Sequence, residues 1–110
     1  MSKSADPAIV KEIRRIASDP TRVLPFGTAK WDMVAHRLTT GDVCDKIIEW
    51  IDARERVKPV VINKIPQFLE MNAYEMKPRI NNILFYIKVM LREAGNVGEQ
   101  MLLISVHPSH

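Results

Sequence analysis

The sequence predicts an α+β fold in which helices come first and a small antiparallel sheet follows. In the first half of the chain, apolar residues recur at the spacing of amphipathic helices. From residue 72 onward, they alternate as in strands, with turn residues between the runs. We therefore expect one domain over residues 1–110, with the N-terminal helices packed on one face of three to four strands. The opposite face of this sheet is expected to be partly polar.

The first helix is predicted to begin at Asp6-Pro7 and to end at Asp19-Pro20. Aspartate caps free backbone N–H groups, proline is tolerated at the first helical position, and the residue before a proline avoids the α region. Its apolar stripe consists of Ile9, Val10, Ile13, Ile16 and Ala17. The cations outside this stripe are interpreted as a solvated face rather than an RNA-contacting one: Lys11, Arg14 and Arg15.

The next segment, Thr21 to Phe26, is predicted to be an extended connector interrupted by Pro25. A second helix is expected from Ala29 to Leu38, with Trp31, Val34 and Leu38 on one side. His36 lies near its end and is interpreted as structural.

A third helix is predicted to follow the cap-like cluster at residues 39–42 and to end near Ala53. Its apolar stripe consists of Val43, Cys44, Ile47, Ile48 and Ile51. Since Cys44 lies on this stripe, we expect a core residue rather than a nucleophile.

The remaining chain is predicted to form strands and turns. Pro59 confines a strand within Val57 to Lys64 to a sheet edge or bends its start, and Ile65 to Met71 is expected to be a loop or one helical turn. Asn81-Asn82 and Gly95-Asn96-Val97-Gly98 are predicted turns. On the strand between them, one face carries Ile83, Phe85, Ile87, Val89 and Leu91. On the last strand, we expect Leu102, Ile104 and Val106 on one face, and Leu103, Ser105 and His107 on the other.

Composition is that of an ordinary folded protein, with 46% hydrophobic and 26% charged residues. The net charge of +3 is compatible with nucleic acid or with an acidic protein partner. A single cysteine rules out an intrachain disulfide. Because the sequence shows neither a signal-peptide core nor a membrane-length apolar run, we expect a soluble, cytoplasmic protein without membrane contact.

Several motifs of enzyme chemistry are absent from the sequence. It contains no phosphate-binding loop, no dinucleotide fingerprint, no Gly-x-Ser-x-Gly elbow and no paired carboxylates. Its histidines, His36, His107 and His110, lack the spacing of a zinc site. An enzyme with this sequence is expected to work without a metal or an organic cofactor.

Over most of its length, the chain resembles the MqsR family of bacterial toxin ribonucleases, within the wider RelE-like group. The similar segments are Val10-Lys11-Glu12-Ile13, Asp42 to Ile48, Arg56-Val57-Lys58, Ala73 to Arg79, Phe85 to Val89 and Leu103 to Val106. The chain departs from the family at His107-Pro108, where the family has a lysine. The resemblance implies a RelE-like fold, messenger RNA as substrate, and an antitoxin protein as partner.

If the chain acts like these toxins, the 2′-hydroxyl of RNA attacks the adjacent phosphate, and cations and a proton-transferring group must assist. The candidates for phosphate binding are Lys77, Arg79 and Lys88, with Lys58 as a further one. Tyr74 and Tyr86 can stack on bases or donate to the phosphate. His107 is the candidate for proton transfer, since histidine titrates near neutral pH.

Each candidate also has a structural interpretation. Tyr86 and Lys88 are equally consistent with an amphipathic pair covering a sheet face, Tyr74 with a core residue, and His107 with a surface residue near the terminus. The alternative function is therefore a non-catalytic RNA- or protein-binding module on the same fold. A small structural protein with a solvated sheet face is a third hypothesis.

Overall fold

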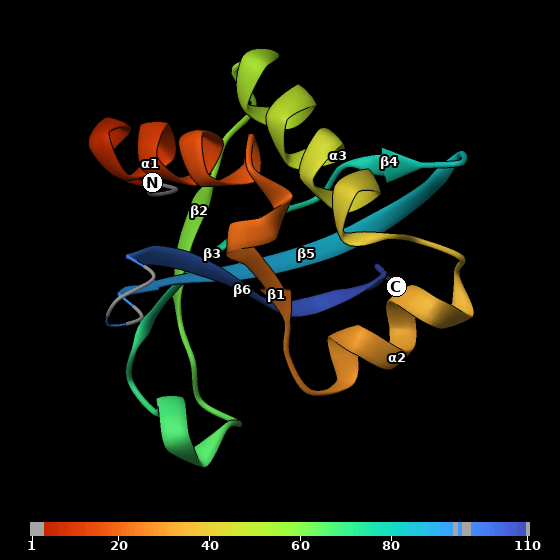
Figure 1. Ribbon diagram of the computed structural model, residues 1–110. Helices are drawn as coiled ribbons and strands as arrows, with labels where there is room; N and C mark the ends of the chain where they lie inside the picture. The colour runs from red at the N-terminus through yellow and green to blue at the C-terminus, as the bar shows by residue number, and fades with distance from the viewer. Residues whose placement is uncertain (1–3, 94, 96–97, 110) are drawn as a thin grey trace.

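The structure is a computed structural model, and it describes residues 4–93, 95 and 98–109. Figure 1 shows α-helices on a central sheet, which confirms the expected α+β class. The α-helices are α1 (Pro7–Ala17), α2 (Thr28–Ala35) and α3 (Thr40–Asp52), and the short 3₁₀ turns are η1 (Pro20–Arg22) and η2 (Pro66–Phe68). The strands are β1 (Val23–Pro25), β2 (Lys58–Val61), β3 (Asn72–Met76), β4 (Arg79–Ile80), β5 (Ile83–Glu93) and β6 (Glu99–Pro108).

The sheet is larger than expected and is mixed rather than antiparallel. Its strand order is β1-β6-β5-β3-β2, and the two-residue β4 pairs with β5. The prediction of three to four antiparallel strands is wrong because it counted only the neighbours along the chain. The connector predicted at residues 21–26 contributes β1, which pairs in parallel with β6, with Val23 opposite Met101.

Side-chain caps define the starts of α1 and α3. Asp6 accepts a hydrogen bond from the Ala8 amide at 2.8 Å, and Pro7 is the first helical residue. Thr39 and Asp42 form a reciprocal capping box, with bonds of 3.0 Å and 2.9 Å to each other's backbone N–H. The predicted boundaries of both helices are confirmed to within two residues.

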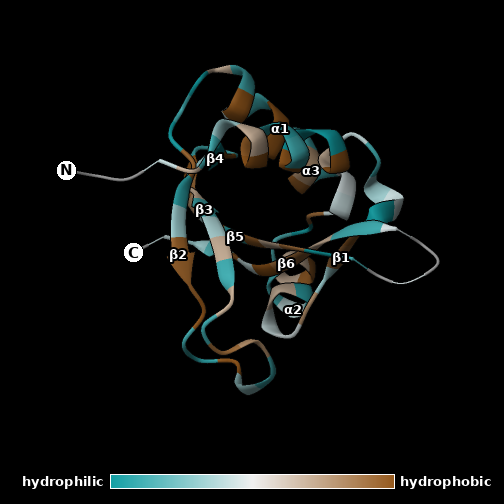
Figure 2. Cartoon of the chain, turned by 90° about the vertical axis from the view of Figure 1, so that its left-hand side faces the viewer, coloured by the Kyte–Doolittle hydropathy of each residue, from teal (hydrophilic) through white to brown (hydrophobic). Residues whose placement is uncertain are grey.

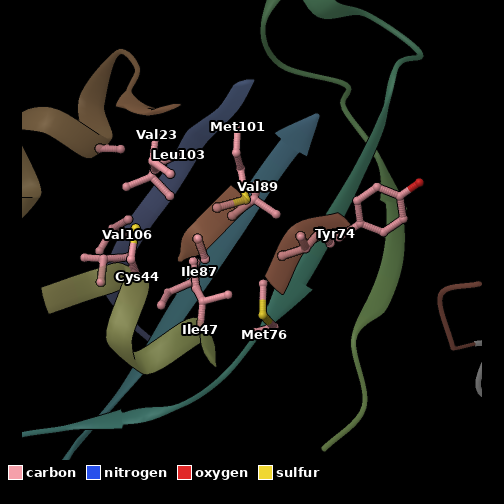
Figure 3. Packing of buried hydrophobic residues seen from close by; sticks show 14 of the residues in the cluster. Val23, Cys44, Ile47, Tyr74, Met76, Ile87, Val89, Met101, Leu103 and Val106 are labelled. Atoms are coloured by element: carbon pink, nitrogen blue, oxygen red, sulfur yellow. The ribbon is translucent and has the colours of Figure 1, made fainter. Parts of the chain in front are cut away.

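Helices α1 and α3 pack together over one face of the sheet, as the view along the sheet in Figure 2 shows. Their buried stripes, which include Ile13, Ile16, Cys44 and Ile47, meet the strand residues Ile87, Val89 and Leu103 in the main core. Figure 3 shows the α3 side of this contact, with Ile47 beside Ile87 and Cys44 beside Val106. Arg14 reaches from α1 to Asp52 of α3 through two hydrogen bonds of 2.7 Å and 2.9 Å.

Helix α2 corrects the sequence-based expectation in two ways. It packs against β6 and lies below that strand in Figure 2, away from α1 and α3. Its buried residues are Ala29 and Met33, whereas Trp31 and Val34 are 69% and 67% exposed. The expected apolar side of Trp31 and Val34 therefore faces outward, because a helix of eight residues contacts β6 through one i,i+4 pair of side chains.

Strand β6 also departs from simple alternation. Lys88 pairs with Ser105 and Val89 with Leu103, so Ile104 is an extra residue at a β-bulge. Met101, Leu103 and Val106 consequently belong to the main core, while Leu102 and Ile104 belong to a second cluster. The prediction that Val106 shares a face with Leu102 and Ile104 is wrong, because strict alternation assumes a regular strand and a bulge residue shifts the residues after it to the other face.

The second cluster covers only part of the other sheet face. Segment 62–71, with η2, folds back over this face and buries Phe68 and Ile62 against Met90, Leu102 and Ile104. Beyond this cover, the same face carries polar side chains. No helix among the described residues combines the length and apolarity that a membrane crossing requires.

Several local predictions are confirmed. Strand β2 lies at the sheet edge, one of the two outcomes predicted from Pro59, and η2 is the helical turn that was predicted as the alternative to a loop within residues 65–71. Asn81 and Asn82 have φ angles of 53° and 65° and connect β4 to β5. In the second predicted turn, Gly95 and Gly98 also have positive φ, whereas Asn96 and Val97 lie outside the described residues.

Candidate functional site

A group of polar side chains occupies the part of the sheet that segment 62–71 leaves uncovered. Its members come from four neighbouring strands and will be called the open-face cluster: Lys58, Glu75, Tyr86, Lys88, Ser105 and His107. Register brings them together, since Lys58 pairs with Glu75, Glu75 with Lys88, and Lys88 with Ser105. Tyr86 and His107 form the adjacent pair. Residues 85, 87 and 89 alternate with them and lie in the main core.

Glu75 is the centre of the hydrogen bonding in this cluster. It is only 9% exposed, and its Oε2 accepts a 2.5 Å hydrogen bond from the Tyr86 hydroxyl. Its Oε1 lies 3.5 Å from the Lys58 ammonium group. A carboxylate this buried requires such partners, because an unpaired charge away from water is costly. The cluster is therefore organised by an internal anion.

Tyr86 retains its proton over the physiological pH range. Burial, followed by the hydrogen bond to Glu75 and the charge of Glu75, raises the pKa of its hydroxyl well above the usual value. Its one hydroxyl proton is donated to Glu75, so toward a ligand the Tyr86 oxygen can only accept a hydrogen bond, and it cannot serve as a base at neutral pH.

His107 of β6 and Lys88 of β5 both lie beside the Tyr86 ring. The rings of His107 and Tyr86 are stacked, with centroids 5.3 Å apart and planes inclined by 19°. The Lys88 ammonium nitrogen is 5.7 Å from the Tyr86 ring centroid, within cation–π range. His107 Nδ1 lies 2.9 Å from the Pro108 carbonyl oxygen. Since a carbonyl can only accept, a neutral His107 carries its proton on Nδ1 and leaves Nε2 as an acceptor.

Lys77 and Arg79, two of the predicted site residues, do not join this cluster. Strand β3 ends at Met76, and Pro78 is buried between the two exposed cations. Lys77 lines a pocket with Lys58 and Glu75, at the sheet edge near the end of α3. Arg79 lines the adjoining pocket and lies 3.5 Å from the Asn82 carbonyl oxygen through Nη1.

Tyr74 lies on the opposite face of the sheet from Tyr86. It is 8% exposed and belongs to the main core, where Figure 3 shows it beside Met76 and Val89. The structure therefore favours the core interpretation of Tyr74 that the sequence left open.

Glu75 and Ser105 are the cluster members that the sequence did not single out. Glu75 has the right parity to share a face with a neighbouring strand's lysine, but that neighbour becomes known only from the β3–β5 pairing. Ser105 reaches the position opposite Lys88 because of the bulge at Ile104. Neither the β3–β5 pairing nor the bulge at Ile104 can be recognised from the sequence of one strand.

The other reactive or charged candidates have structural surroundings. Cys44 is fully buried, and burial raises the pKa of its thiol to about 11, as expected for a core residue. Arg14 pairs with Asp52, and Arg15 with Glu12 and Glu99. His36 lies edge-on to Phe85, with ring centroids 5.3 Å apart. Over the described part of the chain, no group of His, Cys, Asp and Glu side chains is arranged to bind a metal ion.

Comparisons with protein-family models, with curated proteins and with solved structures return no match for this chain.

Proposed function

We propose that this protein is a metal-independent endoribonuclease that cleaves messenger RNA. In this proposal it is the toxin of a type II toxin–antitoxin pair and acts in the cytoplasm, where a partner protein inhibits it. The observation that carries the proposal is the open-face cluster, which combines a histidine, a protonated tyrosine and two lysines on an uncovered sheet surface. The resemblance to MqsR-type, RelE-like toxins supports the same function.

The reaction requires a base, an acid and positive charge around one phosphate. The 2′-hydroxyl oxygen forms a bond to the adjacent phosphorus while a base removes its proton. The bond from phosphorus to the 5′-oxygen breaks, and an acid returns a proton to that oxygen. The products are a 2′,3′-cyclic phosphate and a 5′-hydroxyl. Cations stabilise the charge that develops on the phosphate oxygens.

The open-face cluster contains a group for each of these roles. His107 Nε2 can take the proton of the 2′-hydroxyl, because its Nδ1 is held by the Pro108 carbonyl. The ammonium groups of Lys88 and Lys58 supply the positive charge. The Lys88 ammonium group is also the acid that returns a proton to the 5′-oxygen, while Tyr86, whose hydroxyl proton is donated to Glu75, contributes its ring beside His107 and Lys88. Glu75 orients Tyr86 and Lys58 rather than contacting the RNA.

A second candidate function is a non-catalytic RNA- or protein-binding module on the same surface. Glu75 favours it, because this buried carboxylate already engages both the Tyr86 hydroxyl and Lys58. A negative charge at this place opposes the approach of a phosphate. A binding module can use the remaining surface without requiring Tyr86 and Lys58 to act on a reacting group.

The test is an RNA cleavage assay with purified protein in the presence of EDTA. Wild type is expected to cleave and to leave 2′,3′-cyclic phosphate ends. His107→Ala is expected to lower the rate by about 10²–10⁴-fold, and Lys88→Ala by about 10²-fold. Lys30→Ala is a matched control on the exposed surface of α2 and is expected to leave the rate unchanged.

The outcomes separate the two candidates. Intact RNA together with normal growth on induced expression contradicts the ribonuclease proposal. RNA that is bound but uncleaved, with binding weakened in Lys88→Ala, identifies the binding module. Cleavage that persists in both cluster variants means that the open-face cluster is not the active site.

A further inference from the structure

A groove lined by several charged side chains leads from the open-face cluster around the edge of the sheet toward the end of α3. It consists of two adjoining pockets of about 240 Å³ and 400 Å³ that share Trp50, Glu55 and Lys77. The first pocket includes Lys58 and Glu75 of the cluster, and the second reaches Arg79. These connected pockets will be called the Trp50 groove. The cluster and the first pocket of the groove therefore share Lys58 and Glu75.

The Trp50 groove carries an excess of uncompensated positive charge. Two of its cations are paired within it, Lys46 with Glu49 at 3.3 Å and Lys58 with Glu75 at 3.5 Å. The cations left are Arg56, Lys77 and Arg79, which over the described residues form no salt bridge, and the carboxylate left is Glu55. Lys77 and Arg79 are exposed and flank the buried Pro78, so the chain presents both to solvent.

An aromatic ring lies in the wall that the two pockets share. Trp50 is half-buried and packs against the main core on one side, and its indole N–H donates to the Arg56 carbonyl oxygen at 3.0 Å. These contacts hold the ring in place while it lines both pockets. Unpaired cations around a fixed aromatic ring are the combination that binds single-stranded nucleic acid, with bases stacked on the ring and phosphates on the cations.

We propose that the Trp50 groove binds the single-stranded RNA that flanks the phosphate held at the open-face cluster. One base stacks on Trp50, and Arg56, Lys77 and Arg79 contact the phosphates. This inference rests on the proposed function, because it takes RNA as the ligand of the adjoining cluster. It also gives Lys77 and Arg79 a binding role away from the reacting phosphate.

Trp50 provides a direct readout of this binding. The chain has two tryptophans, so Trp31→Phe leaves Trp50 as the only one. In this background, we titrate a short RNA oligonucleotide whose 2′-hydroxyls are methylated, which blocks cleavage. Stacking of a base is expected to quench the Trp50 fluorescence. In the reciprocal variant Trp50→Phe, the exposed Trp31 on α2 is expected to show no quenching.

The charge contribution is tested in the same Trp31→Phe background. Lys77→Ala with Arg79→Ala is expected to weaken binding by about tenfold at low salt and to lower the salt slope by about 1.4, about 0.7 for each phosphate that is no longer neutralised. The matched control is Lys11→Ala with Lys30→Ala, which removes the same charge from exposed positions on α1 and α2. It is expected to change the affinity by less than about twofold.

Three results overturn the inference: RNA that binds without quenching Trp50, equal weakening by the two double variants, and equal quenching by polyglutamate. The last identifies the groove as a site for an acidic peptide instead. Failure of the proposed function is separate, because it is read from the cleavage of unmodified RNA. If the wild type cleaves unmodified RNA but the methylated RNA does not quench Trp50, only the proposed role of the groove is contradicted.

Discussion

Tyr86 owes its properties to neighbours on three other strands. Its hydroxyl donates to Glu75 on β3, its ring stacks on His107 of β6, and Glu75 in turn holds Lys58 of β2. A tyrosine on an amphipathic strand would otherwise present an ordinary exposed hydroxyl. The tertiary contacts convert it into a fixed donor with a raised pKa.

Tyr86→Phe is expected to destabilise the protein by about 1–2 kcal/mol, because the buried Glu75 loses one of its two partners. Urea unfolding measures this change. Tyr74→Phe is the matched control, since over the described residues the Tyr74 hydroxyl forms no side-chain hydrogen bond, and its effect is expected to stay within about 0.5 kcal/mol. Equal effects of the two substitutions would contradict the role of the Tyr86 hydroxyl.

Burial of Tyr86, together with its hydrogen bond to Glu75, predicts a dependence of stability on alkaline pH. The pKa of Tyr86 is raised above its usual value of 10.0, so the folded state binds the proton more tightly than the unfolded state. This contribution is complete below pH 10.0 and declines as the pH rises further. The stability difference between wild type and Tyr86→Phe is therefore expected to shrink above that pH in parallel urea titrations.

Among the elements, α3 is the one whose limits the sequence states most clearly. Its capping box and its apolar stripe are both local patterns, since each depends on residues within one or two helical turns. Helix α2 has no side-chain cap and exposes Trp31 and Val34. Its buried side was mispredicted because only the position of β6 decides which residues of α2 are covered.

Thr39→Ala is expected to destabilise the protein by about 1 kcal/mol, because the Asp42 amide loses its cap. Thr28→Ala is the control, since the first turn of α2 has no side-chain cap to lose. Thermal or urea unfolding compares the two. The Thr39 backbone and side-chain hydrogen bonds lower the pKa of Asp42, so their contribution is present above pH 3.8 and is lost as the pH falls below it. Since an alanine at position 39 keeps the backbone N–H that donates to Asp42, the difference that is expected to narrow in acid is the one between wild type and Asp42→Ala.

Over the full chain, β6 joins the two ends of the sequence into one sheet. Its Leu103 is fully buried, lies opposite Pro25 and Val89, and accepts a hydrogen bond from the Phe26 amide through its carbonyl at 2.9 Å. The main core therefore depends on contacts between segments that are far apart in sequence. Folds with many such contacts fold more slowly than folds built from local contacts.

Leu103→Ala is expected to cost about 2–5 kcal/mol, a large part of the ~5–15 kcal/mol typical of a whole domain. Leu24→Ala is the matched control, because Leu24 is 39% exposed on the adjoining β1, and it is expected to cost less than about 1 kcal/mol. Urea unfolding followed by circular dichroism measures both. Similar costs for the two substitutions would contradict the central position of Leu103.

Local patterns in the sequence were sufficient for the α+β class, for the limits of α1 and α3, for the Asn81-Asn82 turn and for the burial of Cys44. Periodicity, caps and turn residues act over a few neighbouring positions, so one sequence contains them. The parallel β1–β6 pair, the bulge at Ile104 and the covered side of α2 depend on segments distant in the chain. Strand register also decides which polar side chains share a surface. For this reason the sequence did not indicate Glu75 as a member of the cluster, or that Lys77 and Arg79 lie apart from Tyr86.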